Sequence, residues 1–287
     1  MEIKEKREYF QLPNQNISLY TSLMYRGDTI EHDKKDLLVL LNGFGRTFLD
    51  FQSMRKSLHS FHENLVTLSL DNRFSGKTIV SKDDDASIPS MANDVLMLVK
   101  YYLNNFHFKS YDLLGISMGG MIAQSVAASN SFLGNLILVS TTIGGPLRVF
   151  SKERPKKDFE ELSQDNVQEK FSKYVSNYFK EKNPELFKMF LRSLEKVNKK
   201  ENSFSLKKQH DSSISFDGTL FYDKIKARTL IIHGEDDSII PFENAYILNE
   251  RIQGSSLLSY KKVGHLILLE NSREFVSDVS HFLFSQR

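Results

Sequence analysis

Short runs of consecutive apolar residues recur along the chain, and between them apolar residues are spaced three or four positions apart. An uninterrupted apolar run of about four to eight residues is typical of a strand that is buried on both faces, as in a parallel sheet. Apolar residues at the wider spacing are typical of a helix with one buried face. The predicted buried strands are Leu37–Leu41, Leu65–Leu70, Tyr111–Leu114, Leu136–Val139, Thr229–His233 and Leu257–Tyr260.

The start of the chain has a different pattern. Residues 9–12 and 17–25 alternate in polarity around a turn signal at Pro13–Asn16, which predicts a β-hairpin. Helices are predicted after the later strands. Three of them span Ile88–Phe106, Gly119–Ala128 and Phe242–Arg251, and two others start near Phe48 and near Asn271. Because strands and helices alternate, the sequence predicts an α/β fold with a doubly wound, mostly parallel sheet.

Residues 147–222 interrupt this alternation. The segment is rich in Lys, Glu, Asn and Phe and contains no run that predicts a buried strand. Because the strand pattern resumes at Thr229, we interpret the segment as a helical cap inserted into one core domain of residues 1–146 and 223–287. Apolar spacing predicts two cap helices; one carries Val167, Phe171, Tyr174, Val175 and Tyr178, and the other, which begins after Asn183 at Pro184, carries Phe187, Phe190, Leu191 and Leu194.

Charge and cysteine content narrow the classes of function. The chain has 38 Lys or Arg and 36 Asp or Glu, and this near balance argues against nucleic-acid binding through bulk charge. The absence of cysteine excludes disulfides, thiolate metal sites and cysteine nucleophiles. No apolar run approaches the roughly 18 residues that cross a bilayer, and the charged first residues lead into no secretory signal. We therefore expect a cytoplasmic protein with no membrane span; the sequence leaves its oligomeric state open.

The stretch Leu113–Gln124 holds the most informative motif. A short apolar strand, a sharp turn and a helix of small residues surround Gly115-x-Ser117-x-Gly119, which is the pattern of a nucleophile elbow. A Cβ at either glycine would collide with neighbouring backbone, so both glycines keep the turn open. A serine hydroxyl is a weak nucleophile that needs a base and N–H donors for a developing oxyanion. The turn presents Ser117 where such groups can reach it.

Two later loops carry the partners that such a serine needs. Asp237 follows one predicted strand, and His265 follows the last one. Because the carboxyl ends of parallel strands share an edge of the sheet, Ser117, Asp237 and His265 can converge there as nucleophile, orienting carboxylate and base. The adjacent Asp236 competes with Asp237 for the carboxylate role. His233 also ends a strand, and we assign it to core packing.

Three motifs follow one another in a distinctive order: Gly115-Ile116-Ser117-Met118-Gly119-Gly120, Gly234-Glu235-Asp236-Asp237 with Pro241, and Gly264-His265 with Glu270. In these motifs and their order the chain resembles the α/β-hydrolase superfamily, over nearly all of its length outside the cap. The resemblance is to the branch of esterases, lactonases and carbon–carbon hydrolases, whose helical cap follows the sixth strand. It implies a triad of Ser117, His265 and Asp237, because the spacing matches Asp237 rather than Asp236. It also implies that the backbone N–H groups of Phe44 and Met118 bind the oxyanion.

The resemblance implies a function as well. We expect a serine hydrolase that needs no cofactor or metal and cleaves a small-molecule carboxylic ester, lactone or related acyl substrate through an acyl-enzyme. Hydrolysis of a carbon–carbon bond or a thioester uses the same triad and is the alternative. A ligand-binding protein that keeps the hydrolase fold without turnover is the non-enzymatic alternative.

Two positions depart from the family pattern. Asn42-Gly43 stands where the family usually has His-Gly, and Phe74 replaces a glycine in the turn formed by residues 71–76. The first change affects how the loop before Phe44 is held, and the second affects the local backbone.

Three further features each allow two interpretations. Arg46 either pairs with an acidic group of the substrate or lies on the surface. Lysines between Lys196 and Lys208 are interpreted as a solvated face. The cap aromatics either line an apolar pocket over Ser117 or pack the cap on the core; they are Phe171, Tyr174, Tyr178, Phe187 and Phe190.

Overall fold

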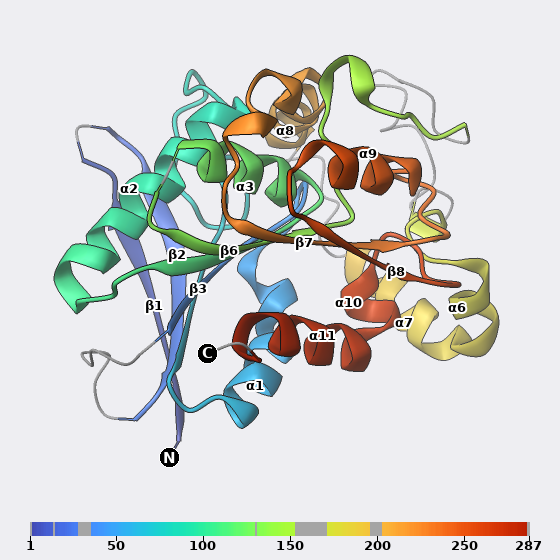
Figure 1. Cartoon of the computed structure of the whole chain (residues 1–287), viewed down its shortest axis with the longest axis horizontal. Helices are drawn as coiled ribbons and strands as arrows, with labels where there is room; N and C mark the ends of the chain where they lie inside the picture. The colour runs from blue at the N-terminus through green and yellow to red at the C-terminus, as the bar shows by residue number, and fades with distance from the viewer. Residues whose placement is uncertain are drawn as a thin grey trace.

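An eight-stranded sheet runs through the protein, and helices cover both of its faces (Figure 1). The computed structural model describes residues 2–13, 15–27, 36–129, 131–152, 171–195 and 203–285. The strands are β1 (Ile3–Gln11), β2 (Ser18–Arg26), β3 (Asp36–Leu41), β4 (Leu65–Leu70), β5 (Tyr111–Ile116), β6 (Leu133–Val139), β7 (Arg228–Gly234) and β8 (Ser256–Tyr260). Each strand predicted from the sequence is present, with its ends shifted by a few residues.

The strands lie in the order β1-β2-β4-β3-β5-β6-β7-β8. β1 and β2 form the predicted antiparallel hairpin, and β2 pairs antiparallel with β4. From β4 to β8 all neighbouring strands are parallel. The predicted doubly wound, mostly parallel sheet is therefore confirmed, and the carboxyl ends of its six parallel strands meet along one edge.

Consecutive apolar residues in the central strands serve two separate cores. Because successive side chains of a strand point to opposite faces, Val39 packs into one core and Leu40 into the other. The first core lies under α2 (Ile88–Phe106), α3 (Met118–Ser129) and α9 (Glu243–Arg251). The second core lies under α1 (Gln52–Phe61), α10 (Ile267–Glu270) and α11 (Ser272–Phe284), on the opposite face of the sheet in Figure 1.

The longest helix, α2, begins and ends at residues suited to those positions. The Ser87 hydroxyl accepts a hydrogen bond from the Ser90 N–H, and Pro89 occupies the first turn. The helix ends at His107, whose φ of 57° lies in the left-handed region. Among the described residues, no helix has the length and apolar character needed to cross a lipid bilayer.

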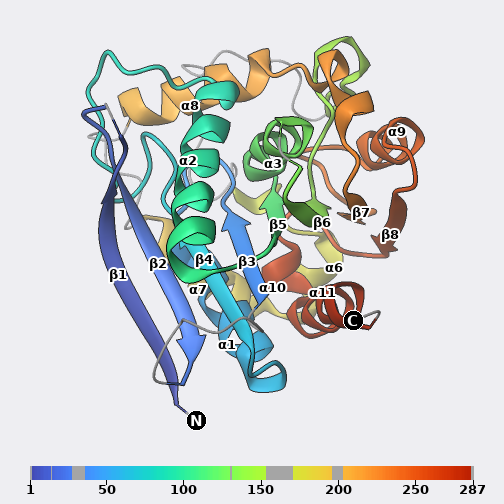
Figure 2. The ribbon, with the colours of Figure 1, turned by 60° about the vertical axis from the view of Figure 1, so that its left-hand side comes forward.

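The described part of residues 147–222, which we call the inserted segment, consists of helices and the loops that connect them. It contains α6 (Asn177–Lys182), α7 (Pro184–Glu195), which starts where the sequence predicts, and α8 (Ser203–Ser215). Figure 2 shows α8 at the end of the sheet toward which β3 and β5 point. The expectations stated above for Val167 and for the lysines at 196–202 fall on residues outside the described ones.

One expectation for the inserted segment is wrong, and one helix was missed. The helix predicted to continue from Phe171 to Tyr178 is interrupted, because the Ser176 hydroxyl caps α6 by accepting a hydrogen bond from Phe179 N–H at 3.0 Å. α8 was not predicted, because its buried positions hold Gln209 and Ser212 instead of apolar residues.

Candidate active site

Ser117 lies at the sharp turn between β5 and α3. Its φ of 56° is in the left-handed region, which is strained for a residue with a side chain. Its N–H donates to Val139 O at 2.9 Å, which ties the turn to the neighbouring strand. A Cβ on Gly115 would lie 2.2 Å from Gly119 O, and one on Gly119 would lie 2.2 Å from Leu41 O. Both glycines therefore have the steric role that the sequence predicted.

His265 lies between Ser117 and Asp237. Its Nε2 is 3.2 Å from Ser117 Oγ, and its Nδ1 is 2.8 Å from Asp237 Oδ2. Asp237 follows β7 and His265 follows β8; both residues are buried, whereas Ser117 is half-buried. The structure thus brings these three residues together at the carboxyl edge of the sheet. Asp236 is exposed and has no contact with His265 among the described hydrogen bonds.

Both oxygens of the buried Asp237 carboxylate have partners. Oδ1 accepts hydrogen bonds from the N–H groups of Ile239 and Ile240, each at 2.9 Å. Oδ2 lies 2.8 Å from His265 Nδ1 and 3.2 Å from His233 Nε2. Burial by itself raises the pKa of Asp237, but the charge of His265 and the hydrogen bonds from both histidines outweigh it and hold that pKa below its ordinary value. Asp237 is therefore ionised at neutral pH.

An ionised Asp237 fixes the tautomer of His265. A carboxylate can only accept a hydrogen bond, so Nδ1 of His265 carries a proton and donates it. Nε2 of the neutral ring is then free to accept the hydroxyl proton of Ser117. This is the arrangement that a general base needs.

His233 has a second role besides the core packing assigned to it. It is fully buried, and its Nε2 donates to Ile240 O at 2.8 Å. The same nitrogen faces Asp237 Oδ2, so His233 supports the carboxylate as well. The sequence contained a signal for this contact, because His233 ends the strand four residues before Asp237.

The backbone N–H groups of Phe44 and Met118 are unused donors beside the serine. Met118 is the first residue of α3, so its N–H has no acceptor one turn earlier in the helix. Among the described residues, neither N–H donates to another protein group. Gly43 places the loop close to the serine, because a Cβ built on it would lie 3.4 Å from Ser117 Cβ and 3.9 Å from Ser117 Oγ.

The two departures from the family pattern are accommodated locally. Asn42 Nδ2 donates to Leu70 O at 2.8 Å, and Asn42 O accepts from Asn72 Nδ2 at 3.1 Å, so the loop after β3 is tied to the end of β4. Phe74 has a φ of 60°, the left-handed conformation that glycine adopts without strain. Phe74 thus adopts a left-handed backbone conformation with its aromatic side chain buried.

Residues 173–176 of the inserted segment cross the loop that carries His265. Tyr174 O accepts hydrogen bonds from the N–H groups of His265 at 3.0 Å and Leu266 at 3.2 Å. The Tyr174 ring stands edge-on to the imidazole, with 5.6 Å between the ring centroids. Ser238 Oγ, next to Asp237, donates to Lys173 O at 2.7 Å. The loops that carry His265 and Asp237 are thus both joined to this stretch.

Glu270 also joins the inserted segment to the loop that carries His265. Its Oε2 accepts the Ser176 N–H at 2.9 Å, and both of its oxygens lie 3.1 Å from the Gly264 N–H. Burial raises the pKa of Glu270 and outweighs the hydrogen bonds from Ser176 and Gly264, with a further increase from the charge of Asp237. The sequence singled out Glu270 only as part of a motif, because its partner in the inserted segment is remote along the chain.

Arg46, the cap aromatics and Lys208 were each given two interpretations or an expected place on the surface. Arg46 is engaged within the protein by two hydrogen bonds of 2.6 Å to Asp50. Of the cap aromatics, Tyr174 contacts the His265 ring, whereas Tyr178 is 45% exposed. Lys208, expected on a solvated face, is only partly exposed, and its Nζ lies 5.7 Å from the ring centroids of Phe74 and Phe204.

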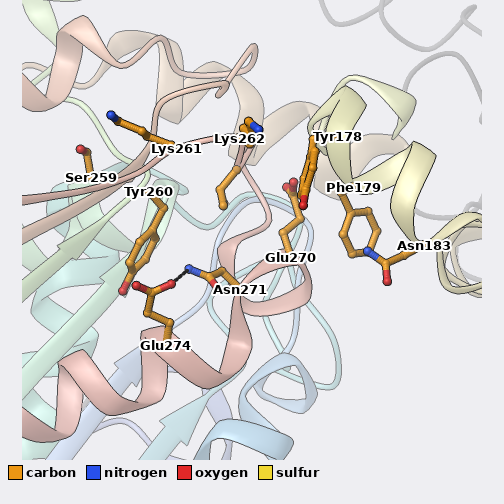
Figure 3. Close-up of a pocket in the computed structure, with 11 residues that line it drawn as sticks. Tyr178, Phe179, Asn183, Ser259, Tyr260, Lys261, Lys262, Glu270, Asn271 and Glu274 are labelled. Atoms are coloured by element: carbon orange, nitrogen blue, oxygen red, sulfur yellow. Dashed lines mark hydrogen bonds between the residues drawn. The ribbon is translucent and has the colours of Figure 1, made fainter.

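A cavity of about 340 Å³ lies beside the His265 loop (Figure 3). None of Ser117, Asp237 and His265 lines it, so it is separate from the reactive groups. Among the described residues, no three His, Cys, Asp or Glu side chains are placed to hold a metal ion. The cavity is lined by Tyr178, Phe179 and Asn183 of the inserted segment, by Ser259, Tyr260, Lys261, Lys262 and Val263, and by Glu270, Asn271 and Glu274.

Comparison with known proteins identifies a family and a fold. The sequence profile of the family described as alpha/beta hydrolase fold matches residues 36–272. An esterase from Exiguobacterium antarcticum has a similar structure, with a TM-score of 0.77 and 20% identity over 96% of this chain and 98% of that one. At this identity the likeness shows the fold.

Two curated relatives match parts of the sequence. A 2-hydroxy-6-oxo-2,4-heptadienoate hydrolase from Pseudomonas putida is 39% identical over 62 residues, which are 22% of this chain and 22% of that protein. A 2-hydroxy-6-oxo-6-(2'-aminophenyl)hexa-2,4-dienoic acid hydrolase from Metapseudomonas resinovorans is 23% identical over 176 residues, which are 60% of this chain and 59% of that protein. The matches therefore span about a fifth and about three fifths of the length of these relatives.

Proposed function

Because the chain belongs to the alpha/beta hydrolase fold family, we propose that it is a serine hydrolase that cleaves a carboxylic ester, a lactone or a related acyl bond. Ser117 is the nucleophile, His265 is the general base and acid, and Asp237 orients and stabilises the imidazole. The N–H groups of Phe44 and Met118 form the oxyanion hole. The reaction needs no group beyond these and water.

In the first half of the proposed reaction, Ser117 Oγ attacks the carbonyl carbon while its proton passes to His265 Nε2. The carbonyl oxygen gains the negative charge and is stabilised by the Phe44 and Met118 N–H groups. The tetrahedral intermediate collapses, the bond to the leaving oxygen breaks, and His265 returns the proton to that oxygen. An alcohol leaves, and the acyl group stays on Ser117.

In the second half, His265 takes a proton from water, and the resulting hydroxide attacks the acyl carbon. The oxyanion forms again at the same two N–H groups. His265 then protonates Ser117 Oγ as the acyl bond breaks, and the carboxylic acid is released.

The single observation that carries this proposal is the hydrogen-bonded series from Ser117 Oγ through His265 to Asp237 Oδ2, at 3.2 Å and 2.8 Å. The low pKa of Asp237 supports it, because it selects the tautomer with a basic Nε2. The strained φ of Ser117 supports it as well, because strained residues cluster at functional sites.

A serine-reactive fluorophosphonate tests the proposal directly. We expect one adduct on Ser117 in the wild-type chain and none in Ser117→Ala, measured by intact mass and peptide mapping. A panel of p-nitrophenyl esters of increasing acyl length then reports turnover, with the Ser117→Ala variant as the control. Folded wild-type protein that neither labels nor turns over any acyl substrate contradicts the proposal and favours a ligand-binding protein.

Hydrolysis of a carbon–carbon bond is the second candidate, and the two curated relatives favour it by the substrates in their names. We propose to measure hydrolysis of 2-hydroxy-6-oxo-2,4-heptadienoate beside that of p-nitrophenyl acetate. A higher kcat/KM on the dienoate, lost in Ser117→Ala, favours this candidate. A higher value on the ester favours the leading one.

We also propose that residues 147–222 act as a cap on a core domain of residues 1–146 and 223–287. The hydrogen bonds of Tyr174 with the loop that carries His265 and of Ser176 with Glu270 support this division. So does the position of α8 at the carboxyl edge of the sheet (Figure 2).

A further inference from the structure

A side chain of the inserted segment reaches the loop that holds one of the proposed oxyanion donors. Gln209 of α8 is fully buried, and both ends of its amide are used. Its Oε1 accepts the Gly45 N–H at 2.8 Å, and its Nε2 donates to Arg73 O at 2.7 Å. Gly45 directly follows Phe44, so this hydrogen bond fixes the peptide next to the donor.

The two ends of this loop are held by the body of the protein. Its middle is a turn closed by the Arg46 N–H, which donates to Gly43 O at 3.2 Å, and the Gly45 N–H in that turn is held from α8. Asn42 is tied to the end of β4, and Ser75 Oγ donates to Arg46 O. Between these ends, Gly45 has a φ of 65°, a conformation that leaves its N–H pointing at Gln209. The orientation of the Phe44–Gly45 peptide therefore depends on a residue that lies outside the predicted core domain.

Other contacts place the same face of α8 on this loop. A Cβ on Gly45 would lie 2.8 Å from Leu206 Cδ2, and Leu206 is three residues before Gln209 on one side of the helix. The ring of His210 stands edge-on to the Phe44 ring, with 6.4 Å between centroids. α8 thus contacts the loop through three neighbouring side chains.

We infer that Gln209 is a positioning residue that holds the Phe44 N–H in the geometry needed to bind the oxyanion. The inference rests on the proposed function and extends it, because it gives the inserted segment a role in supporting the oxyanion hole. An oxyanion hole works only when its donors are aimed at the oxyanion before the reaction, and a misplacement of about 1 Å can cost about 100-fold in rate. Loss of the Gly45 hydrogen bond should therefore weaken binding of the transition state more than binding of the substrate.

The test compares Gln209→Met, which keeps the length of the side chain but neither polar end, with a matched change in the same helix. Ser212→Ala is the control, because Ser212 Oγ donates to Ala86 O at 2.5 Å and so anchors α8 to the body away from the oxyanion loop. Gln209→Met loses two buried hydrogen bonds between α8 and the body, and Ser212→Ala loses one. Only the first loses a contact with the loop of Phe44.

The measurements are the rate of fluorophosphonate labelling, kcat and KM on one p-nitrophenyl ester, and inhibition by a trifluoromethyl ketone, whose adduct carries an oxyanion. For Gln209→Met we expect labelling and kcat to fall about 10- to 100-fold and the ketone to bind more weakly by a similar factor, with KM nearly unchanged. For Ser212→Ala we expect wild-type values. Thermal unfolding of both variants reports any general loss of stability.

Two outcomes overturn the inference. Wild-type labelling and ketone affinity in folded Gln209→Met overturn the inference, and so do equal losses in both variants. If Gln209→Met does not fold, Gln209→Leu, which also lacks both polar ends, is measured in its place with the same expectation. Absence of labelling in the wild-type chain counts against the proposed function itself, so the two failures are distinguishable.

Discussion

Replacement of Asp237 by asparagine tests the proposed roles most sharply, because the structure dictates how the new side chain would sit. Asp237 Oδ1 accepts two backbone N–H groups, from Ile239 and Ile240. An asparagine keeps its oxygen on that side, since its NH₂ group cannot accept these bonds. The NH₂ group then faces His265 Nδ1, at the position where Oδ2 now lies at 2.8 Å.

This orientation reverses the tautomer of His265. Nδ1 must accept a hydrogen bond from the NH₂ group, so the proton of the neutral ring moves to Nε2, which can no longer take the proton of Ser117. In serine proteases with this triad the corresponding change lowers kcat about 10⁴-fold, which at about 1.36 kcal/mol per decade is about 5.4 kcal/mol of transition-state stabilisation. We expect a loss of this order in Asp237→Asn, because the buried site has no exposed side from which water could substitute.

The assay is the kcat on the best p-nitrophenyl ester, together with the labelling rate at Ser117. Asp236→Asn is the matched control, because it makes the same chemical change at the neighbouring exposed position and should leave both rates close to wild type. A loss of less than tenfold in Asp237→Asn would refute the reasoning. Equal losses in the two variants would refute it as well.

The pH dependence of stability follows from the same carboxylate. The pKa of Asp237 is lower in the folded chain than the value of about 3.9 in an unfolded one, so its ionised form stabilises the fold. This contribution is complete above the unfolded-state pKa and is lost as the pH falls toward the folded-state pKa. The difference in unfolding free energy between wild type and Asp237→Asn should therefore be largest near neutral pH and shrink below about pH 4.

The remaining predictions concern packing around the site. Gly119→Ala should lower the unfolding free energy by at least about 2 kcal/mol in urea denaturation, because its Cβ would lie 2.2 Å from Leu41 O. Gly254→Ala is the control and should cost only about 1 kcal/mol, because no atom lies within 4 Å of its Cβ although its φ is 75°. Equal losses in the two variants would contradict the steric argument. Glu270→Ala should lower the unfolding free energy by about 1–3 kcal/mol by leaving the Ser176 and Gly264 N–H groups without their acceptor. Glu270→Gln should cost less, because it keeps an acceptor oxygen and replaces a carboxyl group whose pKa is already raised. A loss as large as that of Glu270→Ala would contradict this account.

The parts of the fold that were predictable from the sequence are those that depend on local pattern. The central strands stand in two cores at once, so runs such as Leu37–Leu41 have no polar position and are easily recognised. The position of Ser117, Asp237 and His265 at one edge followed from parallel topology, because each follows a strand. The choice between Asp237 and Asp236 needed the family spacing, and the exposure of Asp236 agrees with that choice.

The parts that were missed depend on partners far away in the sequence. α8 carries its contacts on polar side chains such as Gln209, so no apolar periodicity marks it. The interruption at residues 173–176 is explained by hydrogen bonds to the loop of His265, which apolar spacing does not encode. The contact between His233 and Asp237 was overlooked because burial alone accounted for the histidine.

If the proposed function holds, the stretch at residues 173–176 also limits how a substrate can enter. Tyr174 O holds two N–H groups of the loop that carries His265, and Ser176 is bound to the same loop through Glu270. An opening movement of this stretch would break its hydrogen bonds to the His265 loop and displace the proposed base. The site would then have to re-form after each movement. Under the proposed function we therefore expect the substrate to reach Ser117 past another part of the rim, while residues 173–176 stay in place.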